Sequence, residues 1–439
     1  MPRKLVLVVV DGMTPAAFER AVESGRAPAL AYLAEHGDYR KATSVFPSLT
    51  PVCLTSIATG AGPGVHCIPS MVWWERRERR IVEYGSSFAA LRAAGLSQSL
   101  IDTIFNMNER HLSKDATTVY EALEDAGLVA GAVNITCYRG RHRYLPVLPG
   151  LKRAVHGPQR FFFYGLFESD RTGAPFAVRS RRAGSIDAYA SAVGRWLVTR
   201  DGFDFFAYYL SGYDFASHAA GPHGEAAERA LEQTDAAIRA ILDAAGGPDQ
   251  FLERYAVVLL SDHGQTPVGQ AARLQEPFAD LDGEVVVTAS NRAGQVYLLP
   301  GARVDAAALA QRLDGFPAVD VSLRLKGGEV VARRDGADVP VEKLEHPDVA
   351  WRVRSALANP NAGELLVSAA DGWELADLGG RHHAGGGSHG SLLAGDSYVP
   401  VVTAGLETEI RRITDVAPAV LAHFGVTVPE SMETPAGVG

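Results

Sequence analysis

The sequence predicts an α/β fold: a doubly wound, mostly parallel sheet sandwiched by helices, with a smaller α+β cap inserted into it. Two observations carry this prediction. Several short runs rich in Val, Leu and Phe are apolar on both faces, which is typical of strands in a covered parallel sheet. Segments with helical periodicity alternate with these runs, as they do in a doubly wound sheet.

The expected strands and helices alternate along the chain. Buried strands are expected at residues 5–10, 129–133, 203–210, 256–260 and 398–402. Helices are expected between them at residues 15–23, 116–126, 186–198 and 225–244.

Between about residues 264 and 378 the apolar runs become shorter and are separated by turns rich in Gly and Asp. These runs are at 284–288, 295–299 and 329–331, with one helix-like stretch at 306–313. We therefore expect an α/β core made of residues 1–266 and 377–439, and an α+β cap made of residues 267–376 that covers the site and selects the substrate. The irregular stretch 139–182 is expected to form part of a lid.

Composition excludes several classes of protein. The 439 residues are 47% hydrophobic and 21% charged, which is typical of a globular chain that buries a core. The net charge of -9 argues against binding to a nucleic-acid polymer, because such proteins carry surplus Lys and Arg.

The sequence also favours a soluble cytoplasmic protein. Only three cysteines occur, Cys53, Cys67 and Cys137, and they form no CxxC pair, so a reducing compartment is expected. The apolar run at 5–10 is too short for a secretion signal, and no segment has the roughly 20 apolar residues of a membrane span.

Candidate metal ligands come directly after three of the expected strands. Asp11 follows the first strand, Asp214 and His218 follow the strand at 203–210, and Asp262 and His263 follow the strand at 256–260. Because ligands bind at the carboxyl ends of strands in open α/β sheets, we expect these side chains at one edge. Each motif alone is also typical of a turn or a surface pair, so the coincidence carries the argument. Asp and His together favour Zn, Mn or Fe over Ca or Mg.

His389 completes the candidate set. It lies in a glycine-rich stretch, 385–390, where the backbone can approach an ion or a phosphate closely. His382 and His383 lie nearby and rank lower, because His389 stands just before the expected strand at 398–402. A flexible loop with an incidental histidine is the alternative interpretation.

Thr50 is the candidate nucleophile. Thr50 is expected to be the N-cap of a helix, Pro51 its first residue and Gly60 its end. The N-H groups and the positive dipole at this helix end suit a phosphate and a deprotonated hydroxyl. An ordinary capping role for Thr50 is the alternative.

The sequence lacks the motifs of several other enzyme classes. The glycines at 60–64 follow an expected helix, whereas a dinucleotide fingerprint must follow a strand. The sequence contains neither a GxxxxGK[ST] phosphate loop nor a GxSxG nucleophile elbow.

Together these motifs resemble the alkaline phosphatase superfamily, and within it the nucleotide pyrophosphatase/phosphodiesterase branch. The matching motifs occur in the order of that family and span most of the chain: Asp11-Gly12, Phe46-Pro47 before Thr50, Asp214 to His218 with Gly221-Pro222 after it, Ser261-Asp262-His263-Gly264 and Ser388-His389-Gly390.

The resemblance implies two divalent metal ions, zinc with manganese as the alternative. One ion would be held by Asp214, His218 and His389, and the other by Asp11, Asp262 and His263, with Thr50 between them. Thr50 would attack phosphorus and form a phosphothreonine that water then releases. The substrate would be a small-molecule phosphate ester, most simply a phosphodiester, with nucleotides as one class of candidate.

The sequence departs from this branch in two places. Relatives have an aromatic residue after the nucleophile, where this chain has Pro51, and an asparagine that holds a phosphate oxygen has no counterpart between residues 62 and 74. Asn106, Asn108 or Asn134 would have to substitute for it. The residues expected to contact the substrate are Tyr209, Ser70, Trp73 and Asn108, with Trp73 or Trp74 stacking on a base; core packing is the alternative for the aromatic residues.

Other functions remain open on the same scaffold. A phosphomonoesterase or a phosphonate hydrolase, similar to phosphonoacetate hydrolase, is the main alternative because of the missing asparagine. A sulfatase is less favoured, because the Cys-x-Pro-x-Arg motif of sulfatases is absent from this sequence. A phosphosugar mutase would transfer its phosphoryl group instead of releasing it. A binding protein without activity is disfavoured because every expected ligand is present.

Overall fold

The computed structural model describes residues 2–147, 150, 152–169 and 186–433. Its main sheet has eight strands in the order β2-β22-β11-β1-β10-β5-β8-β9. The strands, in chain order, are β1 (Lys4–Val10), β2 (Asp38–Thr43), β5 (Ala130–Val133), β8 (Arg160–Phe163), β9 (Phe167–Glu168), β10 (Phe205–Leu210), β11 (Tyr255–Leu260) and β22 (Tyr398–Ala404). The pairs of β1 with β10 and β11, of β10 with β5 and of β5 with β8 are parallel, so the predicted mostly parallel sheet is confirmed.

The central strand β1 is buried on both faces, because helices cover the sheet on both sides. Its alternate residues belong to two separate hydrophobic clusters, with Leu5, Leu7 and Val9 on one face and Val6, Val8 and Val10 on the other. The first face packs against α3 (Thr50–Thr59), α7 (Val119–Asp125) and α16 (Val416–His423). The second packs against α1 (Pro15–Glu23), α2 (Pro28–Glu35), α9 (Ile186–Arg200), α11 (Glu225–Ala244) and α12 (Pro248–Arg254).

The strand expected at 398–402 is antiparallel to both of its neighbours in the sheet. β22 pairs antiparallel with β11 on one side and with β2 on the other. The chain arrives at β22 from residues 387–397, which lie at the carboxyl edge of the sheet, so the strand starts at that edge and must run the opposite way. Neither β2, an edge strand with charged residues, nor β8 was expected from the sequence.

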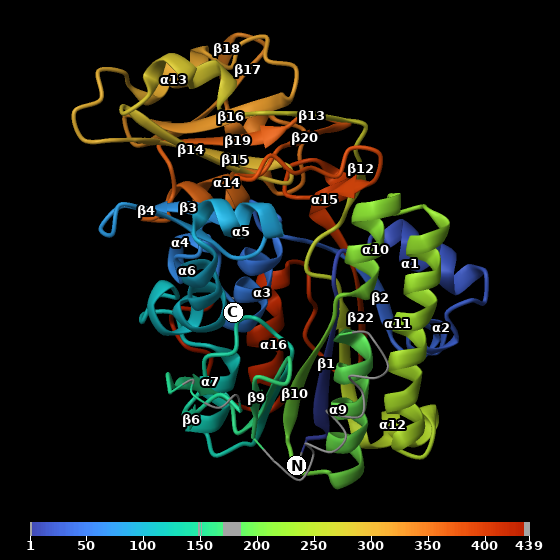
Figure 1. The fold of residues 1–439 in the computed structure, drawn as a ribbon. Helices are drawn as coiled ribbons and strands as arrows, with labels where there is room; N and C mark the ends of the chain where they lie inside the picture. Colours follow the sequence, from blue (N-terminus) through green and yellow to red (C-terminus); the bar gives the residue numbers. More distant parts are fainter. Residues whose placement is uncertain (1, 148–149, 151, 170–185, 434–439) are drawn as a thin grey trace.

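The inserted region contains a second sheet of six strands in the order β14-β15-β19-β16-β17-β18, with every pair antiparallel. These strands are β14 (Val285–Ser290), β15 (Ala293–Leu298), β16 (Val319–Lys326), β17 (Glu329–Arg334), β18 (Ala337–Pro340) and β19 (Leu365–Ala369). One face packs in a cluster with α13 (Ala306–Gln311) and the other in a cluster with α14 (Val349–Leu357). This α+β architecture lies over one end of the main sheet (Figure 1), while the division at residues 267 and 376 stays a prediction.

Smaller elements connect the two sheets. The stretch expected to form a lid, 139–182, contributes β6 (His142–Tyr144), β7 (Val155–Gly157), β8 and β9, and its residues 170–182 lie outside the described part of the chain. The remaining elements are α4 (Pro63–His66), β3 (Val72–Glu75), β4 (Arg80–Glu83), α5 (Phe88–Ala94), α6 (Leu96–Ile101), the π-helix η1 (Asp102–His111), α10 (Gly212–Ala220), β12 (Thr266–Pro267), β13 (Gln270–Ala272), η4 (Glu276–Leu281), η5 (Val341–Lys343), β20 (Trp373–Leu375), β21 (Gly387–Ser388), α15 (Ala394–Ser397) and η6 (Ile413–Asp415). No described helix is both long and apolar enough to cross a membrane.

Two fully buried arginines join the inserted region to the core. The Arg292 guanidinium, at the start of β15, donates to both carboxylate oxygens of Asp396 at 3.0 and 3.2 Å. Arg352 of α14 donates to the hydroxyl of Ser397 at 2.6 Å and to the carbonyl of Val45 at 3.1 Å. Because a buried charge must be paired, these contacts fix how the inserted region sits on the core.

Replacing Asp396 by Ala should therefore destabilise the fold strongly. The substitution leaves the Arg292 guanidinium buried without its partner, which typically costs about 3–5 kcal/mol of unfolding free energy. Glu225→Ala, which breaks the exposed ion pair with Arg229, is the control and should leave the denaturation midpoint unchanged. Equal midpoints for the two variants in urea denaturation would contradict this role of Asp396.

Candidate metal centre

The register of the central strands brings the candidate ligands together. Val10 pairs with Leu210, and Val9 pairs with Leu260, so β1, β10 and β11 end side by side. Asp11 follows β1 directly, and Asp262 follows β11 after one residue. The expectation that these strand ends meet at one edge agrees with this geometry.

The first group consists of Asp11, Asp262 and His263, all buried. The Nε2 atom of His263 lies 3.3 Å from Oδ1 of Asp11 and 3.5 Å from Oδ2 of Asp262. The other oxygen of each carboxylate is held by the protein. Oδ1 of Asp262 accepts from the N-H groups of Gly12 and His263 at 3.2 and 3.1 Å, and Oδ2 of Asp11 accepts from the hydroxyl of Tyr209.

The second group consists of Asp214, His218 and His389. Asp214 and His218 both lie on α10, four residues apart and on one face, with His218 Nε2 at 3.2 Å from Asp214 Oδ2. His389 Nε2 lies 3.9 Å from Asp214 Oδ1. The buried amide of Gln265 donates to Asp214 Oδ1 at 2.8 Å.

The two groups are in contact with each other. The rings of His263 and His389 stack with centroids 3.7 Å apart and an angle of 10° between their planes. Gly12 lies beside Asp262, to which its N-H donates, and beside Asp214. A Cβ atom on Gly12 would lie 2.6 Å from Oδ1 of Asp214. Gly12 also has φ at +66°, so the backbone and the close approach both require glycine here.

The orientation of all three histidines is set by main-chain carbonyls. The Nδ1 atoms of His218, His263 and His389 lie 2.9 Å from the carbonyl oxygens of Gly387, Gly264 and Ser48. A carbonyl only accepts, so each Nδ1 carries a proton, and each Nε2 is the ring atom that faces the aspartates. This arrangement is typical of metal-ligating histidines.

The carboxylates of the first group fit a cation. Oδ1 of Asp11 and Oδ2 of Asp262 are buried and accept no hydrogen bond from a described residue, and both point toward His263 Nε2. Burial and the charge of Asp214 raise the pKa of Asp11, and burial and Asp11 raise the pKa of Asp262 well above its ordinary value. Unpaired buried oxygens are rare, and a bound cation would satisfy both of these.

The histidines respond to the same negative charge. Burial lowers the pKa of His263, but the charges of Asp262 and Asp11 outweigh burial and raise it to about 10. At His218, burial lowers the pKa and the charge of Asp214 raises it, and the net result is a pKa of about 8. Burial and the neighbouring His263 lower the pKa of His389 well below its usual value. The negative charge of the aspartates thus raises the pKa of His263 and His218, whereas burial dominates at His389.

Thr50 lies against the first group, with its Oγ1 at 3.1 Å from His263 Nε2. It is the first residue of α3, and the N-cap is Leu49, so the prediction that Thr50 is the N-cap was wrong. Leu49 supplies the carbonyl that accepts from Val52 and Cys53, and Pro51 has no N-H group. Thr50 thus stands in the first turn of α3, and its hydroxyl lies against His263. Gly60 ends α3 in the left-handed conformation, as predicted.

Two glycines of the glycine-rich stretch pack tightly against α10. A Cβ atom on Gly386 would lie 2.0 Å from the carbonyl oxygen of His218, and one on Gly387 would lie 2.9 Å from that of Ser217. These glycines therefore let the loop pack against the backbone of α10. The loop brings His389 beside His218, while its own backbone contacts the protein.

Several residues at the site were not expected from the sequence. Asn291, in the turn between β14 and β15, has its Nδ2 atom 3.3 Å from Nε2 of His389. His383 stacks on His218 with ring centroids 4.0 Å apart, and its Nδ1 lies 2.8 Å from the buried carboxylate of Glu374 in β20. Asn291 and Glu374 both come from the inserted region, where no local motif marks them.

Of the residues expected to contact the substrate, only Tyr209 lies at the site, where its hydroxyl holds Asp11. Trp73 is buried in the core in a T-shaped contact with His111, and Ser70 is buried as well and does not line the space beside the candidate ligands. Trp73 is held there because the hairpin of β3 and β4 packs its inner face into the first hydrophobic cluster.

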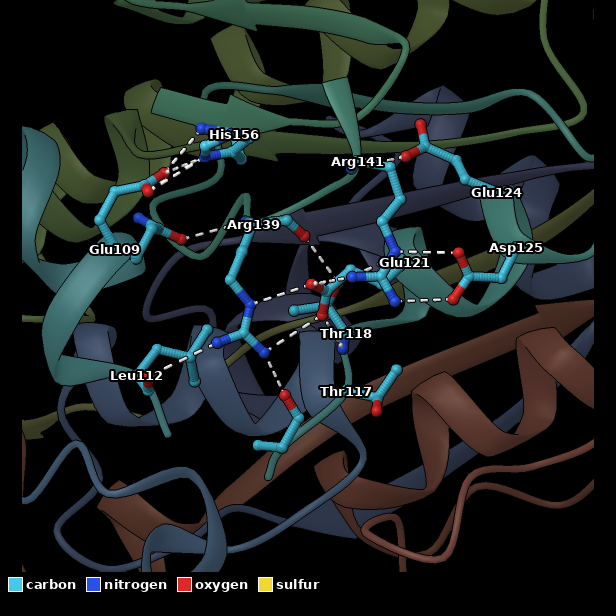
Figure 2. Close-up of polar contacts among 12 residues, drawn as sticks. Glu109, Leu112, Thr117, Thr118, Glu121, Glu124, Asp125, Arg139, Arg141 and His156 are labelled. Carbon is cyan, nitrogen blue, oxygen red and sulfur yellow. Dashed lines mark hydrogen bonds and ion pairs between the residues drawn. The ribbon is translucent and has the colours of Figure 1, made fainter. Parts of the chain in front are cut away.

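The three asparagines considered as substitutes have structural roles. The side chain of Asn108 accepts from the N-H groups of Tyr138 and Arg139 and donates to the carbonyl of Thr136. It thereby helps to place Arg139, which Figure 2 shows bonded to Glu121 and to nearby main-chain oxygens. Asn106 contacts Asp102 and Arg153, and Asn134 accepts from the N-H of Tyr164.

Comparison with known proteins identifies the family. The family model for type I phosphodiesterase/nucleotide pyrophosphatase matches residues 5–392. The chain belongs to this family. The match spans both groups of candidate ligands and Thr50, and it confirms the resemblance to the alkaline phosphatase superfamily. Members of the type I phosphodiesterase/nucleotide pyrophosphatase family are phosphoester hydrolases, and the chain is assigned to that general class.

Solved structures share the fold of this family member. Two structures of phosphonoacetate hydrolase from Sinorhizobium meliloti 1021, in complex with phosphonoformate and with phosphonoacetate, match with TM-scores of 0.66 and 0.64. Sequence identity is 21% and 20%, and each alignment covers 96% of both chains. No curated protein sequence matched the chain.

If the first group holds a divalent metal ion, replacing Tyr209 by Phe should weaken its binding. The substitution removes the hydroxyl that holds one oxygen of Asp11, and loss of such a partner typically lowers metal affinity about 10- to 100-fold. Tyr208→Phe is a matched control, because the Tyr208 hydroxyl faces the other side of the sheet without a hydrogen-bond partner among the described residues. Competition with a zinc chelator would measure both affinities, and equal affinities would rule out this role of Tyr209.

Proposed function

We propose that this protein hydrolyses a small phosphodiester by a phosphothreonine mechanism at Thr50, with two divalent metal ions held by the groups described above. The observation that carries the proposal is the position of the Thr50 hydroxyl, 3.1 Å from Nε2 of His263, whose ring stacks on His389 of the other group. Zinc is the expected metal, with manganese as the alternative, because the ligands are carboxylates and imidazoles.

The bound ions would lower the pKa of the threonine hydroxyl and neutralise charge on the phosphoryl oxygens. The Thr50 oxygen bonds to phosphorus while the bond from phosphorus to the leaving oxygen breaks, and the leaving alcohol takes up a proton. Water then cleaves the phosphothreonine and restores the Thr50 hydroxyl. The carbonyls that bond each histidine Nδ1 keep the rings in place through both steps.

Asn291 supplies the amide that the sequence lacks near residue 70. Its Nδ2 lies beside His389, from where it would donate to a phosphoryl oxygen. Because Asn291 belongs to the turn between β14 and β15, the cap supplies part of the site as well as its cover. This supports the prediction that the cap selects the substrate.

A phosphonate hydrolase is the second candidate function. The likeness in fold to phosphonoacetate hydrolase favours it, and the same nucleophile would then break a phosphorus-carbon bond, with the carbon taking up the proton. A small-molecule substrate, the absence of nucleic-acid and membrane partners, and a cytoplasmic location stay predictions.

Replacing Thr50 by Ala should abolish hydrolysis of bis-p-nitrophenyl phosphate, with a loss of at least about a thousandfold in kcat, because it removes the hydroxyl that lies against His263. Thr50→Ser should retain measurable activity and trap as a phosphoserine on acid quenching. Unchanged release of p-nitrophenol by Thr50→Ala would eliminate this nucleophile. Release from p-nitrophenyl phosphate alone would show a monoesterase.

Metal should stabilise the native protein. Removing ions with a chelator and adding back zinc at about 100 times its Kd should raise the unfolding free energy by about 2.7 kcal/mol, visible as a higher Tm. Asp262→Asn should lose this increase, because it removes a carboxylate oxygen aimed into the first group. Asp280→Asn, at an exposed ion pair with Arg312, is the control. A zinc-independent Tm in the native protein would contradict metal binding.

A further inference from the structure

A cavity of about 740 Å³ opens from the candidate metal centre, and it is lined by Asp11, Thr50, Asp214, His218 and His389 together with residues outside the two groups of candidate ligands. A cavity of this size exceeds what a bare phosphoryl group needs. The rest of the space must accept the groups attached to phosphorus, so its lining indicates their chemistry.

Most of this lining is apolar. Met71, Tyr84 and Ile104 contribute from the hairpin region and the π-helix, and Phe163, Tyr164 and Leu166 contribute from the end of β8 and the following turn. The hydroxyl of Tyr84 is turned away to Nδ1 of His111, at 2.7 Å, so this ring offers the cavity an apolar surface.

The hydroxyls in the lining are mostly used within the protein. Ser86 donates to Glu83, Ser87 accepts from the N-H of Ala90, and Thr103 donates to the carbonyl of Ser99. Thr136 Oγ1 has no hydrogen-bond partner among the described residues. The wall therefore offers few free polar groups.

The described part of the lining offers no Lys or Arg side chain to pair with a second anion. Among the described residues that line the cavity there is no Lys or Arg. His383 lines it too, but its ring already faces the carboxylate of Glu374. A carboxylate or an additional phosphate on the substrate would lose its hydration there without gaining a cationic partner, which is unfavourable.

Phe215 gives the cavity an exposed aromatic ring. It follows Asp214 directly on α10, lines the cavity, and is 80% exposed. A large apolar side chain that is left exposed beside a ligand gains stability when a bound apolar group covers it.

From these observations we infer that the cavity is a subsite for an uncharged aromatic or alkyl substituent on phosphorus, which packs against Phe215. The inference rests on the proposed hydrolase function and names its substrate class: phosphodiesters and phosphonate monoesters whose only negative charge is on the phosphoryl group. Phosphonoacetate and nucleoside triphosphates, which carry further anionic groups, fall outside this class.

Two substrates with the same leaving group and charge test the subsite: the p-nitrophenyl monoesters of phenylphosphonate and of methylphosphonate. We expect the native zinc-loaded protein to favour the phenyl compound in kcat/KM by about two- to tenfold, and Phe215→Ala to bring this ratio close to one. The ratio cancels any effect of the substitution on metal binding. Phe88→Ala, at another exposed phenylalanine that does not line the cavity, is the matched control and should keep the native ratio.

The outcomes separate the subsite from the reaction. Thr50-dependent release of p-nitrophenol with an equal ratio in the native protein and in Phe215→Ala would overturn the subsite and leave the hydrolase function standing. Faster turnover of phosphonoacetate than of the phenyl compound would also overturn it. Release from neither ester, together with no hydrolysis of bis-p-nitrophenyl phosphate, would overturn the hydrolase function and the subsite with it.

Discussion

Three carboxylates buried within a few ångströms of one another are the constraint on which the rest of the site depends. Asp11, Asp214 and Asp262 end neighbouring strands or start the helix after one, and mutual repulsion would disfavour them without compensation. One oxygen of each carboxylate accepts a hydrogen bond from the protein, and three histidines direct their Nε2 atoms toward the aspartates. The requirement left unmet is positive charge, and the candidate metal ions would supply it.

The inserted region contributes residues that contact the candidate site. Glu374 orients His383 against His218, Asn291 contacts His389, and the Arg292 main chain donates to the carbonyl of His389 at 2.8 Å. The placement of these histidines therefore depends on the inserted region. Exchanging the segment would disturb the environment of two histidines as well as the cavity.

Local patterns in the sequence were sufficient to predict the part of the site that the main sheet builds. Buried strands, and acidic residues placed directly after them, were enough to bring Asp11, Asp262 and His263 together, because the ends of parallel strands meet at one edge. Asn291 could not be found in this way, since a turn in a different sheet reaches the site only through the packing of the inserted region. Trp73 shows the converse: an indole ring suits stacking on a base, while the hairpin that carries this one turns the ring into the core.

The place of β22 in the main sheet has a consequence for synthesis on the ribosome. This strand, residues 398–404, lies between β2 and β11, although β2, residues 38–43, is made near the start of the chain. Until β22 has emerged, β2 has no partner in the sheet, and His389 is made only shortly before it. The candidate group that needs His389 is therefore completed late in synthesis, long after the residues of the group made of Asp11, Asp262 and His263 are in the chain.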